Sequence, residues 1–286
     1  MLARSTIQLL RFHFSIFLLP VYLFAISQVN NINPLRAFLI FIILHVFVYP
    51  SSNGYNSYMD RDETPIGGLS KPMQPTKQLY YTSISLDFIA VALSTIISLY
   101  FAAGILIYIL ASRAYSYRGI RLKKYPVTGY LVVIIFQGAE IFFLTYYGSS
   151  DPQTFQMPIT SIIAASCLIG GYYPLTQVYQ HEEDLKDGVK TISYLLGKKG
   201  TFVFCGIVFT TATISMFLTF QQQNNLRDFW LFIVCMLPMV WFFSKWALQV
   251  WKNEQAANFK NSLIMNVLAS ACTSICFLII LIQNHF

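Results

Sequence analysis

Charged residues are scarce in this chain. Only 11% of its 286 residues are Asp, Glu, Lys or Arg, whereas soluble globular domains carry roughly 25%. Hydrophobic residues make up 56% of the chain and aromatic residues 16%. This balance excludes an ordinary cytosolic enzyme, which would expose too much apolar surface to water. It also excludes a disordered chain, whose composition would be polar.

Cysteine is also sparse, and it follows no pattern. The five cysteines all lie inside apolar segments, with neither metal-ligand spacing nor partners in loops: Cys167, Cys205, Cys235, Cys272 and Cys276. This arrangement excludes a disulfide-rich secreted scaffold. We expect all five to be reduced and packed in the interior.

Long apolar segments make up most of the chain. A helix needs about 20 apolar residues to cross a bilayer, and such segments fall at 11–28, 35–50, 79–100, 102–117, 126–147, 157–176, 201–221, 228–249 and 261–283. The sequence therefore predicts an all-α, polytopic membrane protein with nine transmembrane helices. Because 79–117 is too long for one crossing, we expect a tight reversal at Ala102, Ala103 and Gly104.

The basic residues predict an orientation. With the N-terminus inside the cell, all of the 19 Lys and Arg residues except Arg36 and Arg227 fall in or near the inner ends of the helices. Short loops rich in Lys and Arg stay on the cytoplasmic side. The C-terminus is then outside, and we expect a multi-pass protein of a bacterial cytoplasmic membrane. The net charge of +7 is explained by this topology, and nucleic acid is not an expected partner.

Two polar segments at inner helix ends resemble each other. Residues 49–63 read YPSSNGYNSYMDRDE and residues 173–187 read YPLTQVYQHEEDLKD. They align without a gap at an offset of 124 residues. Such self-similarity is typical of duplicated structural units. We expect a single membrane domain over 1–286, with pseudo-repeats of four helices at about 1–125 and 126–255 and a ninth helix at 261–283.

Each polar segment would place two amides and two acids along one helix face. At about 100° per residue, Asn53, Asn56, Asp60 and Glu63 lie within roughly an 80° arc, as do Gln177, Gln180, Asp184 and Asp187. Polar groups at membrane depth face a protein interior or a watery cavity, so both faces should point inward. Facing carboxylates need a hard divalent cation, and Mg²⁺ combines a few carboxylates with water and phosphate oxygens.

Basic side chains accompany these acids. Lys71 ends a Gly/Pro-rich loop after the first segment, Lys190 follows the second, and a third inner loop at 115–124 holds Arg121 and Lys123. Carboxylates, flexible loops and cations on one membrane face suit a metal-bridged diphosphate. The alternative is that these are solvated charges that follow the positive-inside rule.

In these residues the sequence resembles the UbiA superfamily of intramembrane prenyltransferases. Asn56 and Asp60 match the family's first motif, Asn-Asp-x-x-Asp-x-x-x-Asp, and Asp184 matches the last Asp of its second, Asp-x-x-x-Asp. The segment from Tyr115 to Lys123 resembles the family's Tyr/Lys loop. The likeness is specific in 53–72, 115–124 and 173–200.

The chain also departs from the family pattern. Ser57, Thr64 and Gln180 stand where the family has acids. Asp62, Glu63 and Asp187 are nearby substitutes, and the duplicated spacing favours Glu63 and Asp187. The number of bound metals stays open.

The resemblance implies a nine-helix bundle that transfers an isoprenyl group from its diphosphate to an aromatic or lipophilic acceptor. It implies Asp60 and Asp184 as catalytic residues. The implied Mg²⁺ ligands are Asn56, Asp60, Glu63, Asp184 and Asp187, and the implied substrate-binding residues are Lys71, Arg121, Lys123, Lys190, Tyr115, Asn53, Gln177 and Gln180. Two other hypotheses are a non-catalytic binder of isoprenoid diphosphates and a cation-coupled transporter.

Other polar residues fall within the apolar segments. Asp87 lies in the third, and Gln137 and Glu140 lie near the middle of the fifth. An acid at this depth indicates either a functional contact or interhelical hydrogen bonding. Arg11, near the start of the first segment, either approaches the site or extends to the membrane surface.

Overall fold

The structure, a computed structural model, describes residues 1–285 and contains no β-strand within that range. Its nine long apolar spans confirm the predicted all-α architecture for these residues. They are Arg4–Ser27, Pro34–Asp60, Lys77–Ile97 (α5), Leu99–Ser116 (α6), Pro126–Ser149, Ile159–Thr176, Ile192–Gln222 (α11), Leu226–Lys252 (α12) and Phe259–His285 (α13).

Several spans are composed of more than one helical element. The first comprises α1 (Arg4–Leu10), η1 (Phe12–Leu18) and α2 (Leu19–Ser27); the second α3 (Pro34–Ile42), η2 (Ile43–Val48) and α4 (Tyr49–Asp60); the fifth α7 (Pro126–Val133), η4 (Ile134–Glu140) and α8 (Ile141–Ser149); the sixth α9 (Ile159–Tyr172) and η5 (Tyr173–Thr176). Three short helices lie in the connections: η3 (Leu122–Lys124), α10 (His181–Lys186) and η6 (Glu254–Ala256).

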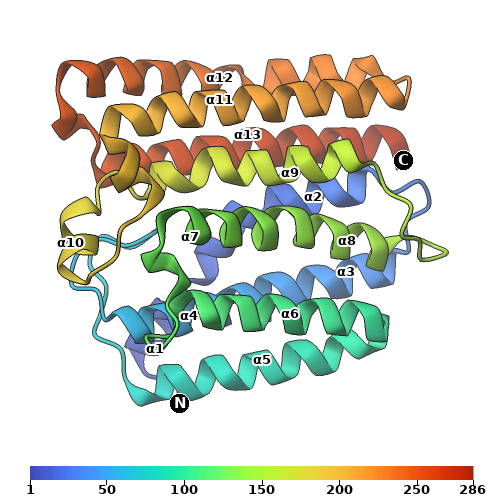
Figure 1. The fold of residues 1–286 in the computed structure, drawn as a ribbon. Coiled ribbons are helices and arrows are strands. Elements are labelled where there is room, and N and C mark those ends of the chain that lie inside the picture. Colours follow the sequence, from blue (N-terminus) through green and yellow to red (C-terminus); the bar gives the residue numbers. More distant parts are fainter. Residues whose placement is uncertain (286) are drawn as a thin grey trace.

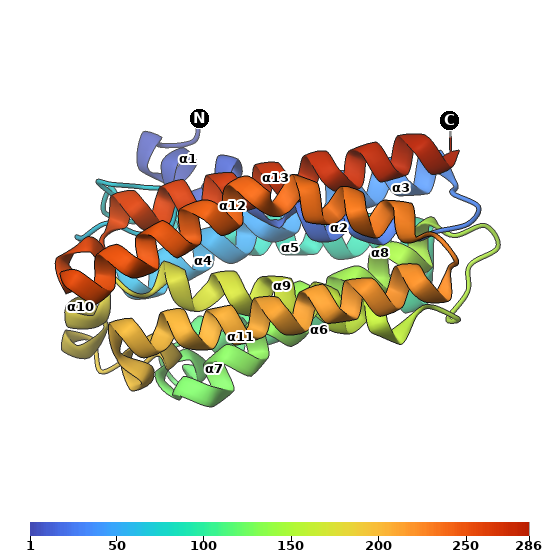
Figure 2. The same cartoon turned by 90° about the horizontal axis from the view of Figure 1, so that it is seen from above.

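The spans lie side by side as one bundle (Figure 1). In that view α5 and α6 form one edge and α11 and α12 the other, while α10 and the start of α7 gather at the end of the bundle opposite the C-terminus. Helix α9 packs against α11, and α13 packs against α2 and α12 (Figure 2). The division into two four-helix pseudo-repeats stays a prediction.

The reversal between the third and fourth spans is at Ser98, so the expectation of a turn at Ala102–Gly104 was wrong. Ser98 is extended, with φ −174° and ψ 163°, and its hydroxyl accepts from the amide of Phe101 at 3.0 Å. A serine that caps the helix start is what ends the preceding helix here. Gly104 instead lies inside α6 against Leu144 of α8, where a side chain would not fit.

Proline accounts for one break in the second span. Pro50 has no amide hydrogen, and its ring would collide with the carbonyl four residues earlier. The backbone before it, η2, is a π-helix, and regular α-helix resumes as α4. This second span ends at Asp60 because Arg61 adopts a left-handed conformation (φ 56°). Glu63 is therefore beyond the helix and off the predicted polar face.

The sixth span ends even earlier. From Tyr173 the chain continues as the 3₁₀ turn η5, which contains Pro174, and then as a loop before α10 begins at His181. Gly170 and Gly171 precede this proline, and each glycine lowers helix stability by about 1 kcal/mol relative to alanine. The expectation that Gln177, Gln180, Asp184 and Asp187 share one helix face is thus wrong. All four residues nevertheless line the same cavity.

A buried ion pair links three spans. Arg113 of α6 donates to Asp87 of α5, and both Arg113 and Asp87 contact the Ser51 hydroxyl of α4. Both charged side chains are largely buried, at 14% and 12% exposure. Arg113 also lies over the Tyr55 ring, 4.1 Å from its centroid. Interhelical bonding is therefore the role that the structure gives Asp87.

The five cysteines are free, as expected. Cys205 and Cys276 are fully buried, and the other three are partly buried.

Gly138 permits a close contact between the fifth and sixth spans. A Cβ atom there would be 2.6 Å from the Cα of Ser166 on α9. We expect Gly138→Ala to force the helices apart and to lower the stability by about 1–3 kcal/mol. Thermal unfolding in detergent measures the loss. The control is Gly206→Ala in α11, where the nearest atom is 4.0 Å away; an equal loss in both variants contradicts the contact.

Candidate active site

A cavity of about 300 Å³ opens at the end of the bundle where α4 and η5 finish. The polar residues at its mouth come from both duplicated segments and from the connection between α6 and α7, and include Asn53, Asn56, Asp60, Asp62, Gln177, Gln180, Asp184, Asp187 and Lys123. Further in, the lining is largely apolar, with Val21, Val133 and Leu168 among its residues. The cavity thus joins a charged mouth to an apolar interior.

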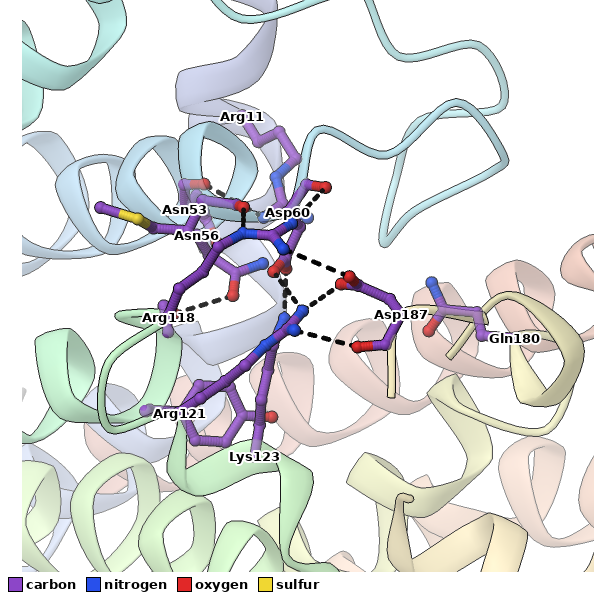
Figure 3. Close-up of polar contacts among 12 residues, drawn as sticks. Arg11, Asn53, Asn56, Asp60, Arg118, Arg121, Lys123, Gln180 and Asp187 are labelled. Carbon is purple, nitrogen blue, oxygen red and sulfur yellow. Dashed lines mark hydrogen bonds and ion pairs between the residues drawn. The ribbon is translucent and has the colours of Figure 1, made fainter. Parts of the chain in front are cut away.

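Asp60 lies at the last position of α4, and its side chain is only 5% exposed. Lys123 donates to one carboxylate oxygen of Asp60, and Arg121 lies 3.5 Å from the other. A carboxylate at a helix C-terminus faces the negative end of the helix dipole, so it needs such cations. The cations come from residues 117–125, which we call the basic loop (Figure 3).

The basic loop also binds the second segment. Arg121 donates to the Asp187 carboxylate and to the Asp187 carbonyl oxygen, the latter at 3.0 Å. Arg118 donates to the carbonyl oxygen of Met59 at 2.7 Å and lies 3.4 Å from the Asp187 carboxylate. Figure 3 shows these side chains converging between Asp60 and Asp187. The basic loop therefore connects the two acidic segments.

The second segment also contacts the loop that follows α4. The Gln180 amide donates to the Pro65 carbonyl oxygen at 3.3 Å. Asp184 lies in the first turn of α10, and its carbonyl oxygen accepts from the amide of Val189 at 2.7 Å. Gly188, at φ 69°, makes this reversal, since a positive φ suits glycine. Asp184 and Asp187 are thereby presented to the same cavity.

Two carboxyl groups in the mouth hold their protons unusually tightly. Burial raises the pKa of Asp184 to about 7, and the charges of Asp62, Asp60 and Asp187 act in the same direction. Burial and the neighbouring Asp60 raise the pKa of Asp62 to about 6. Lys123 opposes both shifts but does not cancel them. Burial is thus the main reason that these two carboxyl groups favour the protonated form.

The structure brings together most of the predicted site residues, but not all of them. Glu63, Lys71 and Lys190 are exposed and lie outside the residues that line the cavity. Asp62 lines the cavity in the place expected for Glu63. The helical spacing behind the choice of Glu63 fails because α4 ends at Asp60.

Arg11 is a site residue that the sequence left undecided. It has a left-handed backbone (φ 47°) between α1 and η1, is 6% exposed, and lines the cavity. Its guanidinium donates to the Gly67 carbonyl oxygen at 3.2 Å and to that of Asn53 at 3.4 Å. Arg11 thus joins the first span to α4 and to the loop after it, and it adds a cation to the mouth.

Tyr115 contacts the second segment. Its hydroxyl shares a hydrogen bond with that of Tyr173, and both residues line the cavity. Asn56 is also positioned from α6, since the Ser116 hydroxyl donates to its side-chain oxygen at 2.8 Å.

The oxygen atoms in the mouth fit Mg²⁺. Within residues 1–285 no three His, Cys, Asp or Glu side chains form a ready metal cluster, because Lys123 and Arg121 lie against the acids. Three buried oxygens nevertheless lack hydrogen-bond partners: Asp60 Oδ1, Gln177 Oε1 and Asp184 Oδ2. Mg²⁺ binds hard oxygens and takes one or two carboxylates together with substrate phosphates, so a closed protein cage is not needed.

The pairing of Lys123 with Asp60 is testable. Lys123→Met leaves the Asp60 carboxylate buried with only the more distant Arg121, so we expect a loss of about 1–3 kcal/mol. Adding Asp60→Asn removes the uncompensated charge and should recover most of this loss. Thermal unfolding of the two variants without added metal is the measurement. A double variant less stable than Lys123→Met contradicts the pairing.

Comparison with known proteins identifies the family. A search of curated proteins finds no match. Among solved structures, a UbiA homolog from Archaeoglobus fulgidus bound to DMAPP and Mg²⁺ is 19% identical, with 97% of this chain and 99% of that chain covered and a TM-score of 0.69. A UbiA homolog from Aeropyrum pernix K1 is 15% identical, with 93% and 98% covered and a TM-score of 0.68.

A third structure, of a digeranylgeranylglyceryl phosphate synthase, is 18% identical, with 98% of both chains covered and a TM-score of 0.63. At these identities the three structures show a shared fold. The sequence profile of the UbiA prenyltransferase family matches residues 17–268, which is most of the chain. The chain therefore belongs to the UbiA prenyltransferase family.

Proposed function

We propose that this chain catalyses the Mg²⁺-dependent transfer of an isoprenyl group from a prenyl diphosphate to an aromatic or lipophilic acceptor in the membrane. The observation that carries the proposal is the single cavity that joins an acidic and basic mouth to an apolar interior. A prenyl diphosphate has the same division, because it pairs a highly charged head with a hydrocarbon tail. Two structures of a UbiA homolog from Archaeoglobus fulgidus in this fold hold Mg²⁺, one with GPP and one with DMAPP.

The acids of the mouth are the proposed Mg²⁺ ligands. Asn56, Asp60 and Asp62 would contribute from the first segment, and Asp184 and Asp187 from the second. When bound, Mg²⁺ neutralises the diphosphate and so makes it a better leaving group. The raised pKa values of Asp62 and Asp184 support this assignment, because burial and the neighbouring acids disfavour their ionised forms and a bound cation would favour them.

Basic residues of the mouth are the proposed ligands of the phosphate oxygens. Lys123 and Arg11 line the cavity, and Arg121 lies between the two acidic segments. In the transfer, the allylic C–O bond breaks and its electron pair leaves with the diphosphate. The acceptor supplies the pair for the new bond and releases a proton. Fixed cations beside the departing oxygens stabilise the charge that develops there.

The interior protects the electron-deficient allylic carbon. Aromatic rings of Tyr115, Tyr173 and Phe136 line the cavity beyond the mouth. Their faces attract positive charge, and the apolar side chains around them keep water away. We propose that the mouth opens on the cytoplasmic side, with the N-terminus inside. The basic loop supports this orientation, since such loops stay on the cytoplasmic side.

Non-catalytic binding of an isoprenoid diphosphate is the second candidate. Ser57, at a family acid position, is buried and does not line the cavity, while Gln180 is bonded to Pro65. The chain therefore offers fewer acids than the family pattern. Saturable binding of GPP without release of diphosphate would favour this candidate. A cation-coupled transporter is less consistent with the site, since the carboxylates of the mouth lie at one end of the bundle rather than near its middle.

Replacement of one acid in each duplicated segment tests the proposed prenyl transfer. We expect Asp60→Asn and Asp184→Asn each to lower Mg²⁺-dependent release of diphosphate from GPP by at least about 100-fold, because each variant loses an oxygen charge that holds the metal. The assay uses detergent-purified protein with a membrane extract as the source of acceptor. Glu182→Gln, an exposed acid on α10, is the control. Full turnover in both Asp variants would refute the proposal.

Variants of the adjacent residues Asp62 and Glu63 test which of the two acids is a metal ligand. Mg²⁺ and GPP together should stabilise the wild-type protein against heat, because a ligand that binds only the folded state raises its stability. We expect Asp62→Asn to reduce this stabilisation and Glu63→Gln to retain it, since only Asp62 lines the cavity. The opposite pattern would restore Glu63 as the working acid.

A further inference from the structure

A second set of polar side chains lies deeper in the cavity, away from the acidic mouth. Tyr49 and Ser52 come from α4, Tyr108 and Ser112 from α6, and Gln137 from η4; all five line the cavity. We call these five residues the deep polar cluster. Tyr49 precedes Asn56 by seven residues, which is about 10 Å along a helix. Tyr49 is thus about two helical turns from the proposed metal ligand Asn56, whereas Ser52 is about one turn from it.

Side chains within the cluster are close to one another, but not all of their polar groups have hydrogen-bond partners. The Ser52 and Ser112 hydroxyls share a hydrogen bond of 2.6 Å. The rings of Tyr49 and Tyr108 are 6.3 Å apart between centroids. Tyr49 is 1% exposed, and its hydroxyl has no hydrogen-bond partner. Burial of an unpaired hydroxyl is unfavourable, so a ligand that bonds to it would remove that cost.

The backbone beside the cluster is irregular on two spans. The π-helix η2 ends directly before Tyr49, and the π-helix η4 contains Gln137 and Glu140. Glu140 has a buried carboxylate oxygen without a partner. π-Helical segments often occur at functional sites. Pro50 explains η2, whereas η4 contains Gly138, which packs closely against Ser166 of α9.

The charge around the cluster restricts what it could bind. Among the residues that the structure describes, the cations lining the cavity are Arg11 and Lys123, and both belong to the mouth. Arg113 is near the cluster in sequence, but it is paired with Asp87 and does not line the cavity. An anionic group beside Tyr49 would therefore have no Lys or Arg of the cavity lining to compensate its charge, and the His45 ring, 5.1 Å from that of Tyr49 between centroids, is buried. A neutral hydroxyl would find hydroxyl and amide partners.

Apolar side chains also line the cavity, from other elements. They are Leu18 and Val21 of the first span, Leu168 and Ile169 of α9 and Ala269 of α13. These side chains suit a hydrocarbon tail, and the cluster suits a polar group. With the diphosphate at Asp60, an acceptor held at the cluster would place its ring between that polar anchor and the allylic carbon.

We propose that the deep polar cluster is the acceptor subsite, and that the acceptor is an uncharged lipophilic compound recognised through a hydroxyl group. This inference rests on the proposed prenyl transfer. It selects phenols and alcohols over the carboxylated aromatic acceptors of the same size. Tyr49 and Gln137 are the residues that set this preference.

Three probes of one size test the inference. α-Naphthol carries a hydroxyl, α-methoxynaphthalene lacks the hydrogen-bond donor, and α-naphthoate is an anion at neutral pH. Their saturable binding to the detergent-purified full chain is measured with Mg²⁺ and a non-reactive thio analogue of GPP. We expect naphthol to bind at least about tenfold more tightly than the other two, because the site pairs a neutral hydroxyl and leaves a carboxylate uncompensated.

Variants assign the preference to the cluster. Tyr49→Phe should weaken naphthol binding by about 3- to 10-fold, as expected for one lost hydrogen bond, and Gln137→Leu should act in the same direction. The affinity for the GPP analogue should change by less than about twofold. Tyr146→Phe is the control, since Tyr146 is buried on the fifth span but does not line the cavity.

The outcomes separate the two proposals. Tighter binding of naphthoate, no saturable naphthol binding, or wild-type naphthol affinity in both variants would overturn the acceptor subsite while leaving prenyl transfer standing. Failure of the GPP analogue to bind with Mg²⁺ would instead overturn the proposed function. Loss of the analogue in Tyr49→Phe alone would place this residue in the donor site and would also overturn the inference.

Discussion

The central constraint on this protein is negative charge held at the end of two membrane helices. Asp60 lies at the C-terminus of α4, where the helix dipole adds to its charge, and Asp62, Asp184 and Asp187 share the same cavity. Burial raises the pKa values of Asp62 and Asp184, and the neighbouring carboxylates act in the same direction. The basic loop compensates for part of that charge and, in doing so, connects the two duplicated segments.

The same constraint explains why the site suits a metal and a diphosphate together. Lys123 and Arg121 bind carboxylates in this structure, and both are cations that also bind phosphate oxygens. If Mg²⁺ bound the acids with a diphosphate beside them, Lys123 and Arg121 would be free to exchange carboxylate partners for phosphate oxygens. Such an exchange would preserve the number of charge pairs and would involve side chains of the basic loop.

Much of the fold was predictable from the sequence. Nine apolar segments, the two duplicated segments and the basic loop were located because hydrophobic length and charge act locally along the chain. Details of the site were less predictable, because the helical spacing was assumed to persist to residue 63. Arg61 ends the helix two residues earlier and Arg118 bonds to its last turn, at the Met59 carbonyl oxygen, a contact between distant parts of the chain. Asp62 is consequently in the cavity and Glu63 is not.

The roles of polar residues within the membrane spans were also difficult to predict from the sequence. Asp87 and Glu140 look alike in sequence, as single acids within apolar spans. Asp87 is paired with Arg113 across helices, whereas Glu140 has a buried oxygen without a partner. Arg11 likewise gave no sequence signal for its buried position, because that position depends on a left-handed residue and on carbonyl oxygens of a distant loop. Only the partners of such residues distinguish a structural role from a site.

The exchange of partners in the mouth is tested most directly by a crystal structure with Mn²⁺ and a non-reactive thio analogue of GPP. Mn²⁺ accepts the same oxygen ligands as Mg²⁺ and is located by its anomalous scattering. The account predicts manganese between the two acidic segments, in contact with Asp60 or Asp62 and with Asp184 or Asp187, and Lys123 on the diphosphate. Manganese elsewhere, or Lys123 still bonded to Asp60 beside a bound diphosphate, would contradict it.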